Sequence, residues 1–225
     1  MSLIQTVVPC HNCLLNRTLL VWACIILTLA AACPAATQYW DSATSAGYQH
    51  GNGNWNLADA SWTTNGLAPQ AAFVNGNSAF FTAVGGSSLV QIAAPITAEV
   101  VTVNGSVYEI RHAGGGAMYV TNATTIGGTI NKIAIVGGVG VTSTWDNGST
   151  GITLGGVTGN LFVIDGGGVS GSAVVTNTGA LIIGSASEVG DSVIVSNKGE
   201  LYVSGVIRIG TGSATESDAS LVIAQ

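Results

Sequence analysis

Residues 166–171, which read GGGVSG, have a spacing that could support chemistry. The pattern G-x-G-x-x-G is typical of dinucleotide-binding loops, and Asp191 follows at the distance where an acidic residue would hold the ribose. Such a loop requires a helix directly after its glycines, because the helix N-terminus holds the pyrophosphate. The glycines here are followed by SAVVTNTG, which is rich in β-branched residues. We therefore expect a corner between strands at this point, with no bound cofactor.

Few histidines and cysteines are available for catalysis or metal binding. Beyond the first 36 residues only His50 and His112 remain, and His112, which precedes a run of glycines, is expected in a solvated turn. All 4 cysteines lie within the first 33 residues. The C-x-x-C pair at 10–13 has no second Cys or His pair at the spacing of a zinc site. We expect no metal site.

Clustered carboxylates would indicate a polysaccharide lyase or hydrolase, the enzyme class that stacked β-strands can support. The 11 acidic residues are scattered singly along the chain, and only the segments 188–191 and 216–218 bring two close together. Both segments are polar and insert-like, which favours solvated loops. We therefore expect no enzyme. The enzyme alternative requires four residues to converge on one face: Asp165, Glu188, Asp191 and Arg208.

Composition indicates which elements could position these residues. Charged residues make up 7% of the chain, against about a quarter in an average protein, and there are 32 glycines. Glycine combined with Val, Ile, Thr, Ser and Asn favours many short strands joined by turns. The net charge is −6, and the basic residues form no stripe, so nucleic acid is not an expected partner.

The first 36 residues differ from the rest and predict a signal peptide. Arg17 precedes the apolar run TLLVWACIILTLAAAC, and small residues follow it. These are the features of secretory signals, and the run is shorter than the about 20 residues that span a bilayer. We expect cleavage near Ala36 or Thr37, followed by export. Two alternatives stay open: a signal anchor retained in the membrane, and lipidation at Cys33 in the lipobox-like AAAC.

Two regions follow the leader. Most of the aromatic residues lie in residues 37–105, whereas residues 106–225 consist mainly of Gly, Val, Ile, Thr and Asn. We expect an aromatic-rich β cap module in the first region and β-solenoid repeats in the second. The chain stops inside a repeat, without a polar capping segment, so we also expect it to be a fragment of a longer protein.

Internal repetition predicts how the second region folds. VIVSNKGELYVSG at 193–205 is similar to AVVTNTGALIIGS at 173–185, and apolar residues alternate with polar ones in both. Such alternation is typical of strands with one buried face. A fixed period near 20 residues predicts a solenoid, in which each strand pairs with its equivalent in the next coil. ASLVIAQ at 219–225 starts 28 residues after DSVIV, a surplus that we attribute to the polar insert at 211–218.

The 20-residue offset makes specific predictions about neighbours. Leu181 should stack on Leu201, and Asn177 should form an amide ladder with Asn197. The alternative is that both asparagines are ordinary turn residues. The aligned glycines of the two copies should occupy corners that require positive φ, namely Gly179 and Gly199.

The opening of the first region carries a family resemblance. YWDSATSAGYQHGNGNWNLADASW resembles the first module of exported bacterial proteins with autotransporter-associated β-strand repeats, through Trp40-Asp41, Asn54-Trp55 and Ala60 with Trp62. ITAEVVTVNG at 96–105 resembles the first rung after that module. The resemblance implies a right-handed parallel β-helix, a secreted or cell-surface location of the Gram-negative type, and an adhesive or structural role. No C-terminal barrel or sorting tail is present, which leaves the export route open.

The tryptophans of the first region allow two interpretations. Trp40, Trp55 and Trp62 could stack on sugar rings as an exposed glycan platform, or they could form a buried hydrophobic cap at the start of a solenoid. We favour the cap, with Trp40 and Trp55 mostly buried. The expected function is a non-catalytic exported β-solenoid for adhesion or cell-envelope architecture. The alternative is a carbohydrate-active β-helix, and the partner would be an extracellular polysaccharide or a host or cell surface.

Overall fold

The computed structural model describes residues 35–224 except 44, 69, 113–114, 157–158, 168–169, 185–189 and 211–217. The signal-peptide prediction, Cys33 and the acidic residues Glu188 and Glu216 therefore lie outside the described residues. Residues 35–225 form one compact unit. The described part of this unit is all-β and contains no helix.

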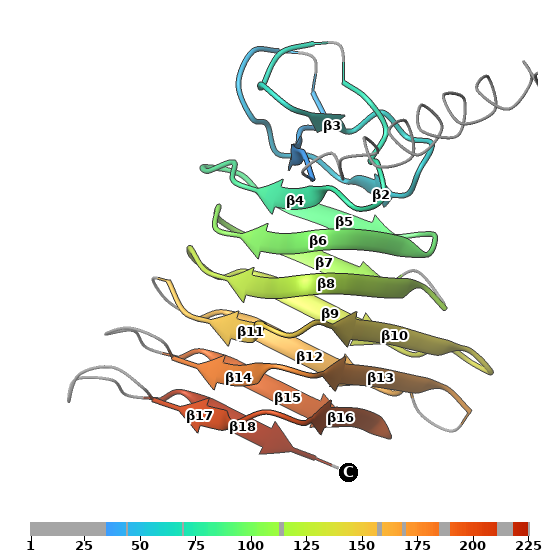
Figure 1. Cartoon of the computed structure of the whole chain (residues 1–225), viewed down its shortest axis with the longest axis vertical. Coiled ribbons are helices and arrows are strands. Elements are labelled where there is room, and N and C mark those ends of the chain that lie inside the picture. Colours follow the sequence, from blue (N-terminus) through green and yellow to red (C-terminus); the bar gives the residue numbers. More distant parts are fainter. Residues whose placement is uncertain are drawn as a thin grey trace, which may run out of the picture. The chain divides into compact units, whose positions relative to one another are not determined.

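The strands are short and follow one another along the chain, as the composition predicts (Figure 1). Their bounds are β1 Thr37–Trp40, β2 Gly53–Trp55, β3 Trp62–Thr63, β4 Ser78–Phe81, β5 Ser88–Ile92, β6 Ile96–Val103, β7 Tyr108–His112, β8 Ala117–Ile126, β9 Lys132–Val136, β10 Thr142–Asn147, β11 Gly151–Leu154, β12 Leu161–Asp165, β13 Ser172–Asn177, β14 Ala180–Ile183, β15 Ser192–Ser196, β16 Gly199–Val203, β17 Ile207–Ile209 and β18 Ser220–Ile223.

The strands build two sheets, and the chain alternates between them. Sheet A contains 11 strands, including the path β16-β13-β10-β8-β6-β4-β1-β3, and sheet B contains 7 in the order β18-β15-β12-β9-β7-β5-β2. All listed pairs between named strands are parallel except β1 with β3. We call each passage through sheet A and then sheet B a rung. Figure 1 shows successive rungs stacked from β4 and β5 to β17 and β18.

Later rungs contain three strands, because the sheet A portion breaks in two at a corner. In the earlier rungs one long strand, such as β8, crosses that corner and pairs with both β10 and β11. In the later rungs Gly148 and Gly179 stand at this corner instead. A Cβ on Gly179 would lie 2.4 Å from the backbone nitrogen of Gly151, so the stacked chains leave room only for glycine.

Alternation along each strand separates the core from the surface. Val175, Leu181 and Ile183 point inward and are buried, as do Val193 and Val195, in agreement with the predicted parity. The resulting core runs without interruption from Trp40 to Val195. The sheets also continue across residue 105, since β5 pairs with β7 and β6 with β8. The change in composition there coincides with no break in strand pairing.

The rung length corrects the predicted period of 20. Equivalent residues are 30 apart in β10 and β13, where Thr142 pairs with Ser172, and 31 apart in β12 and β15, where Leu161 pairs with Ser192. The two similar segments are therefore not successive rungs. One spans β13 and β14 within sheet A, and the other spans β15 and β16, where the chain passes from sheet B to sheet A. Both have the same strand–corner–strand pattern at different corners. The 28-residue offset is a true rung, because Ser192 pairs with Ser220.

Candidate functional site

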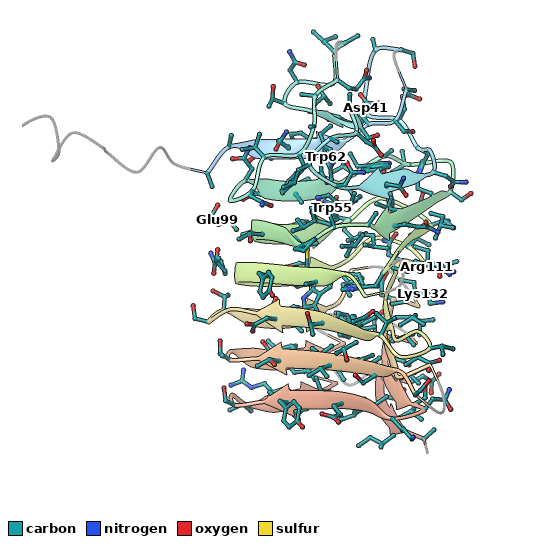
Figure 2. The ribbon with its side chains drawn as sticks, turned by 90° about the vertical axis from the view of Figure 1, so that its right-hand side faces the viewer. Asp41, Trp55, Trp62, Glu99, Arg111 and Lys132 are labelled. Atoms are coloured by element: carbon teal, nitrogen blue, oxygen red, sulfur yellow. The ribbon has the colours of Figure 1, made fainter. Side chains whose placement is uncertain are left out.

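The predicted tryptophan group lies inside the protein. Trp40, Trp55 and Trp62 have no exposed surface and pack with Phe73 and Phe81. Trp40 meets Trp62 edge-on at 5.4 Å, and the indole nitrogen of Trp40 donates to the carbonyl of Gly51. Figure 2 shows Trp55 and Trp62 within the first rungs. The expected burial is observed, and sugar rings have no access to these side chains.

Exposed aromatic side chains lie on the outer face of the same rungs. Because Trp40 and Phe81 point inward, their neighbours Tyr39 and Phe80 point outward, where they pair in register. Tyr48 stacks on Tyr39 with ring centroids 4.4 Å apart and is 37% exposed. We call Tyr39, Tyr48 and Phe80 the outer aromatic cluster. Period-2 alternation beside the tryptophans could have identified Tyr39 and Phe80 from the sequence.

The predicted neighbours of Leu201 and Asn197 are wrong. Leu201 pairs with Val175, and Leu181 pairs with Ile207, so the two leucines do not stack. Asn197 lies at the corner after β15, where its amide donates to the carboxylate of Asp165, 3.1 Å away. The physical reason is the register, which follows the full rung length of about 30 residues.

The amide ladder of Asn177 exists, with a different partner. The side-chain amide of Asn147 donates to the Oδ1 of Asn177 at 3.2 Å, and the Thr124 hydroxyl donates to the Oδ1 of Asn147 at 2.6 Å. All three side chains are fully buried. Asn177 completes its bonds by donating to the carbonyl of Ala180. This ladder fixes the sheet A corner of three successive rungs, and the Val203 that pairs with Asn177 ends it.

A second ladder precedes the strands of sheet B and was not predicted. Asn131 Oδ1 accepts the Tyr108 N–H at 2.9 Å, Asn160 Oδ1 accepts the Asn131 N–H at 3.1 Å, and Asp191 Oδ1 accepts the Asn160 N–H at 2.8 Å. Each side chain thus satisfies a backbone donor of the preceding rung. The sequence signal was an Asx residue directly before each apolar run, spaced by about 30.

Positive φ occurs at other positions than predicted. Gly179 and Gly199 are absent from the residues with positive φ, whereas Asn197 and Lys198 have φ of 46° and 65°. The residue before each sheet B strand position is also left-handed, and in two rungs it is β-branched: Val107 at 56° and Ile130 at 54°. Both side chains are exposed and line a hollow of about 200 Å³.

Charged residues on this side of the molecule lie in register. Glu109 on β7 and Lys132 on β9 are paired, with Nζ and Oε1 3.2 Å apart. Figure 2 shows Arg111 and Lys132 on the same side of the stack and Glu99 on the opposite side. Glu99 accepts a hydrogen bond from the Ser78 hydroxyl at 2.9 Å. Each of these charges therefore serves contacts between neighbouring rungs.

The residues named for the enzyme alternative do not converge where they are described. Asp165 ends β12, whereas Asp191 lies just before β15 beside Asn160, at the opposite end of the paired strands. Arg208 is on β17 in sheet A. Within the described ranges, no group of three or more His, Cys, Asp or Glu residues could hold a metal ion.

His112 does not lie in a solvated turn. It ends β7 and is 3% exposed, because β-strand alternation points it inward toward Trp145, with ring centroids 6.3 Å apart. Its Nδ1 lies 2.7 Å from the carbonyl oxygen of Gly116, so this nitrogen carries the proton. Burial lowers the pKa of His112 to about 4, against the opposing effect of the bond to Gly116.

His50 belongs to a polar group under the aromatic cap. Its Nδ1 lies 2.7 Å from the hydroxyl of Ser88, which also accepts the Gly51 N–H. The imidazole stacks against Tyr108 at 4.6 Å. Burial lowers the pKa of His50 and raises the pKa of Tyr108 to about 12. Ser88 is 3% exposed, so this histidine–serine pair joins β5 to the loop before β2 and has no open approach for a substrate.

The outer face of the rungs carries columns of in-register side chains. In sheet A, Thr102 pairs with Thr125 and Thr125 with Thr153, all half-buried. Phe80 of the outer aromatic cluster precedes this threonine column, since it pairs with Thr102. In sheet B the corresponding column becomes apolar toward the last rungs: Ala134, Val163, Ile194 and Val222.

The last rung, β16 to β18, presents an open end. These strands have neighbours only on the side of β13, β14 and β15 in the part of the chain that the structure describes. Their inward side chains line a hollow of about 360 Å³ that faces solvent: Leu201, Val203, Ile207, Leu221 and Ile223. Ile223 is 72% exposed, and Ile207 and Ile209 are nearly half exposed. We call this surface the open end.

Comparisons with protein families, curated proteins and solved structures give no match to this chain. Across the described ranges, no helix has the length and apolar character needed to cross a membrane. The evidence bearing on function is therefore the geometry given above.

Proposed function

We propose that residues 37–225 form a right-handed parallel β-helix that is exported and serves as a non-catalytic scaffold at the cell surface, for adhesion or cell-envelope architecture. The proposal is supported by the parallel, in-register pairing of successive rungs and by the buried ladders at two corners. A core that passes from rung to rung lets such a fold extend in one dimension, which suits a long contact surface.

The outer columns are the observation that carries this function. The threonine column and the apolar column of sheet B place identical or similar groups at each rung, about 4.8 Å apart. A repeating, weakly charged surface can contact an extended partner at many equivalent points, each contributing little. The low charge content of 7% is consistent with a partner recognised by shape and hydroxyl contacts.

Export is supported by the sequence of the leader and by the resemblance to autotransporter-associated repeat proteins. Arg17, the short apolar run and the small residues before Thr37 suit signal peptidase. The residues that carry the resemblance, including Trp40 and Trp55, lie in the rungs where that module is expected.

Polysaccharide binding is the second candidate, and the outer aromatic cluster favours it. Aromatic faces stack on sugar rings, and Tyr48 offers an exposed ring backed by Tyr39. The threonine column continues from Phe80 and would offer hydroxyl groups to successive sugars of a chain. The site would accordingly lie on this outer face and not at the buried tryptophans.

An adhesion assay with exported protein tests the proposal. Secreted chain should begin near Thr37 and bind cell layers, and Thr125→Arg in the threonine column should weaken binding several-fold. Val139→Arg is the matched control, because Val139 is also an exposed position but lies on the loop before β10. Retention of the leader in a membrane fraction would contradict export, and equal binding by both variants would contradict the role of the column.

A polysaccharide array separates the two candidates. Tyr48→Ala should abolish glycan binding without changing the melting temperature if the outer aromatic cluster binds sugars. Trp55→Ala should instead lower the melting temperature, because it removes a buried ring. Absence of any glycan binding by the wild-type protein would leave only the scaffold function.

A further inference from the structure

We propose that the open end binds a second copy of the same chain, end to end, through a two-fold axis. This inference is independent of the proposed function. It starts from the three parallel strands β16, β17 and β18, whose outer edges present unpaired backbone N–H and C=O groups together with half-covered apolar side chains. Such an edge is a template for pairing with another strand.

The opposite end of the stack cannot serve as the partner surface. There β3 pairs antiparallel with β1, and Trp62 forms a further bridge with Ala71. The aromatic core beneath has no exposed surface at Trp40, Trp55 and Trp62. Head-to-tail growth would need two complementary ends, so association through the open end alone closes at two copies.

A two-fold axis through the corner at Gly205 makes the facing strands antiparallel and compatible in side-chain direction. It sets β16 of one copy opposite β17 of the other. Val203 then faces Ile207 of the second copy, and Leu201 faces Ile209, so that inward-facing residues meet inward-facing residues. On the other side of the same axis, β18 faces its own copy, with Leu221 opposite Ile223.

Charge complementarity supports the same arrangement. Glu200 and Tyr202 point outward on β16, and the Tyr202 hydroxyl donates to the Glu200 carboxylate at 2.7 Å. Arg208 points outward on β17 and is exposed. The two-fold axis brings Arg208 of one copy beside Glu200 and Tyr202 of the other, twice in the dimer. Opposite charges on neighbouring strands stabilise pairing, whereas like charges oppose it.

Sedimentation equilibrium of the full chain tests the inference. We expect a reversible monomer–dimer equilibrium for the wild-type chain. Ile223→Lys should raise the dissociation constant at least about tenfold, because it buries an unpaired charge in the interface. This variant should keep the wild-type melting temperature when monomeric, because Ile223 is 72% exposed in the single chain. Val139→Lys, at a position 89% exposed and away from the open end, is the control and should associate like the wild type.

A charge exchange tests the two-fold geometry itself. Glu200→Arg and Arg208→Glu should each weaken the dimer, and the double variant should restore it. A monomer at every concentration would overturn the proposal, as would growth beyond two copies. The proposal would equally fail if Ile223→Lys and Val139→Lys associated alike, or if the double exchange did not recover association.

Discussion

The two ends of the stack solve the same problem in opposite ways. At the first end, Trp40, Trp55 and Trp62 fill the space above β4 and β5, and no part of their surface is exposed. At the other end, β16 to β18 leave apolar side chains such as Ile207 and Ile223 in contact with solvent. Both ends belong to the same parallel stack, so the contrast arises from the residues that cover the terminal rung.

The difference teaches that stacking alone does not complete this fold. Each rung covers the apolar side chains of its neighbour, and the terminal rungs need a separate cover. The aromatic residues supply it at one end, because large rings bury much area per residue. The ladders of Asn147 with Asn177, and of Asn131, Asn160 and Asp191, order the rungs in between. A variant's effect should therefore depend on its distance from the open end.

Loss of a cap ring should have the largest effect. Trp55→Ala should lower the free energy of unfolding by about 3–5 kcal/mol, the usual cost of removing a large buried ring. Ile223→Ala at the open end should change it by no more than about 0.5 kcal/mol in the monomer, as for an exposed position. Urea denaturation at low protein concentration measures both values. Similar losses at the two positions would contradict the contrast between the ends.

Acid should destabilise the protein through His112. The pKa of this histidine is about 4 when folded, against 6.5 for the model value, so the unfolded chain binds the proton more readily. Stability should be full above about pH 6.5 and should fall as the pH drops toward 4, by about 3 kcal/mol in total. His50 adds to the same trend, since burial lowers its pKa too.

Thermal melts from pH 7 to pH 4 measure this dependence. His112→Phe should flatten most of the profile, whereas the wild-type melting temperature should decline steadily. A wild-type profile that is level between pH 7 and 4 would show that His112 is protonated without cost, which its burial does not allow.

Breaking the sheet A ladder should have an intermediate effect. Asn177→Ala removes the acceptor of Asn147 and leaves a buried amide unpaired, which should cost about 1–3 kcal/mol. Asn197→Ala is the matched control, because its bond to Asp165 is exposed and should contribute less than about 1 kcal/mol. Denaturant melts of the two variants give the comparison. Equal losses would favour the predicted pairing of Asn177 with Asn197 over the observed register.

The smallest effect should come from Asp41 beneath the cap. This side chain has no exposed surface, and its Oδ2 has no hydrogen-bond partner among the described residues. Burial raises its pKa, so the charged form opposes folding above the model value of 3.8. Asp41→Asn should therefore raise the melting temperature at pH 7, and the difference from the wild type should shrink in acid. A lower melting temperature for the variant at pH 7 would contradict this.

The sequence predicted elements and burial better than neighbours. Alternation alone identified the inward residues Val175, Leu181 and Val193, because strand geometry fixes side-chain direction locally. The pairing partners depend on the rung length, which includes corners of variable size. A corner sequence repeated at two different places in the rung therefore suggested the wrong period. Composition could not identify His112 as a core residue, because only its place at the inward parity of β7 determines that.

Amide hydrogen exchange along the chain tests the contrast between the two ends most directly. At concentrations where the protein is monomeric, we expect the slowest exchange in β4 and β5, beneath the aromatic cap. The fastest exchange among the strands should occur in β16, β17 and β18, whose edges are unpaired. Trp55→Ala should remove the protection of the first rungs and leave that of the last rung unchanged. Protection of β16 to β18 equal to that of β4 and β5 in the monomer would contradict the account.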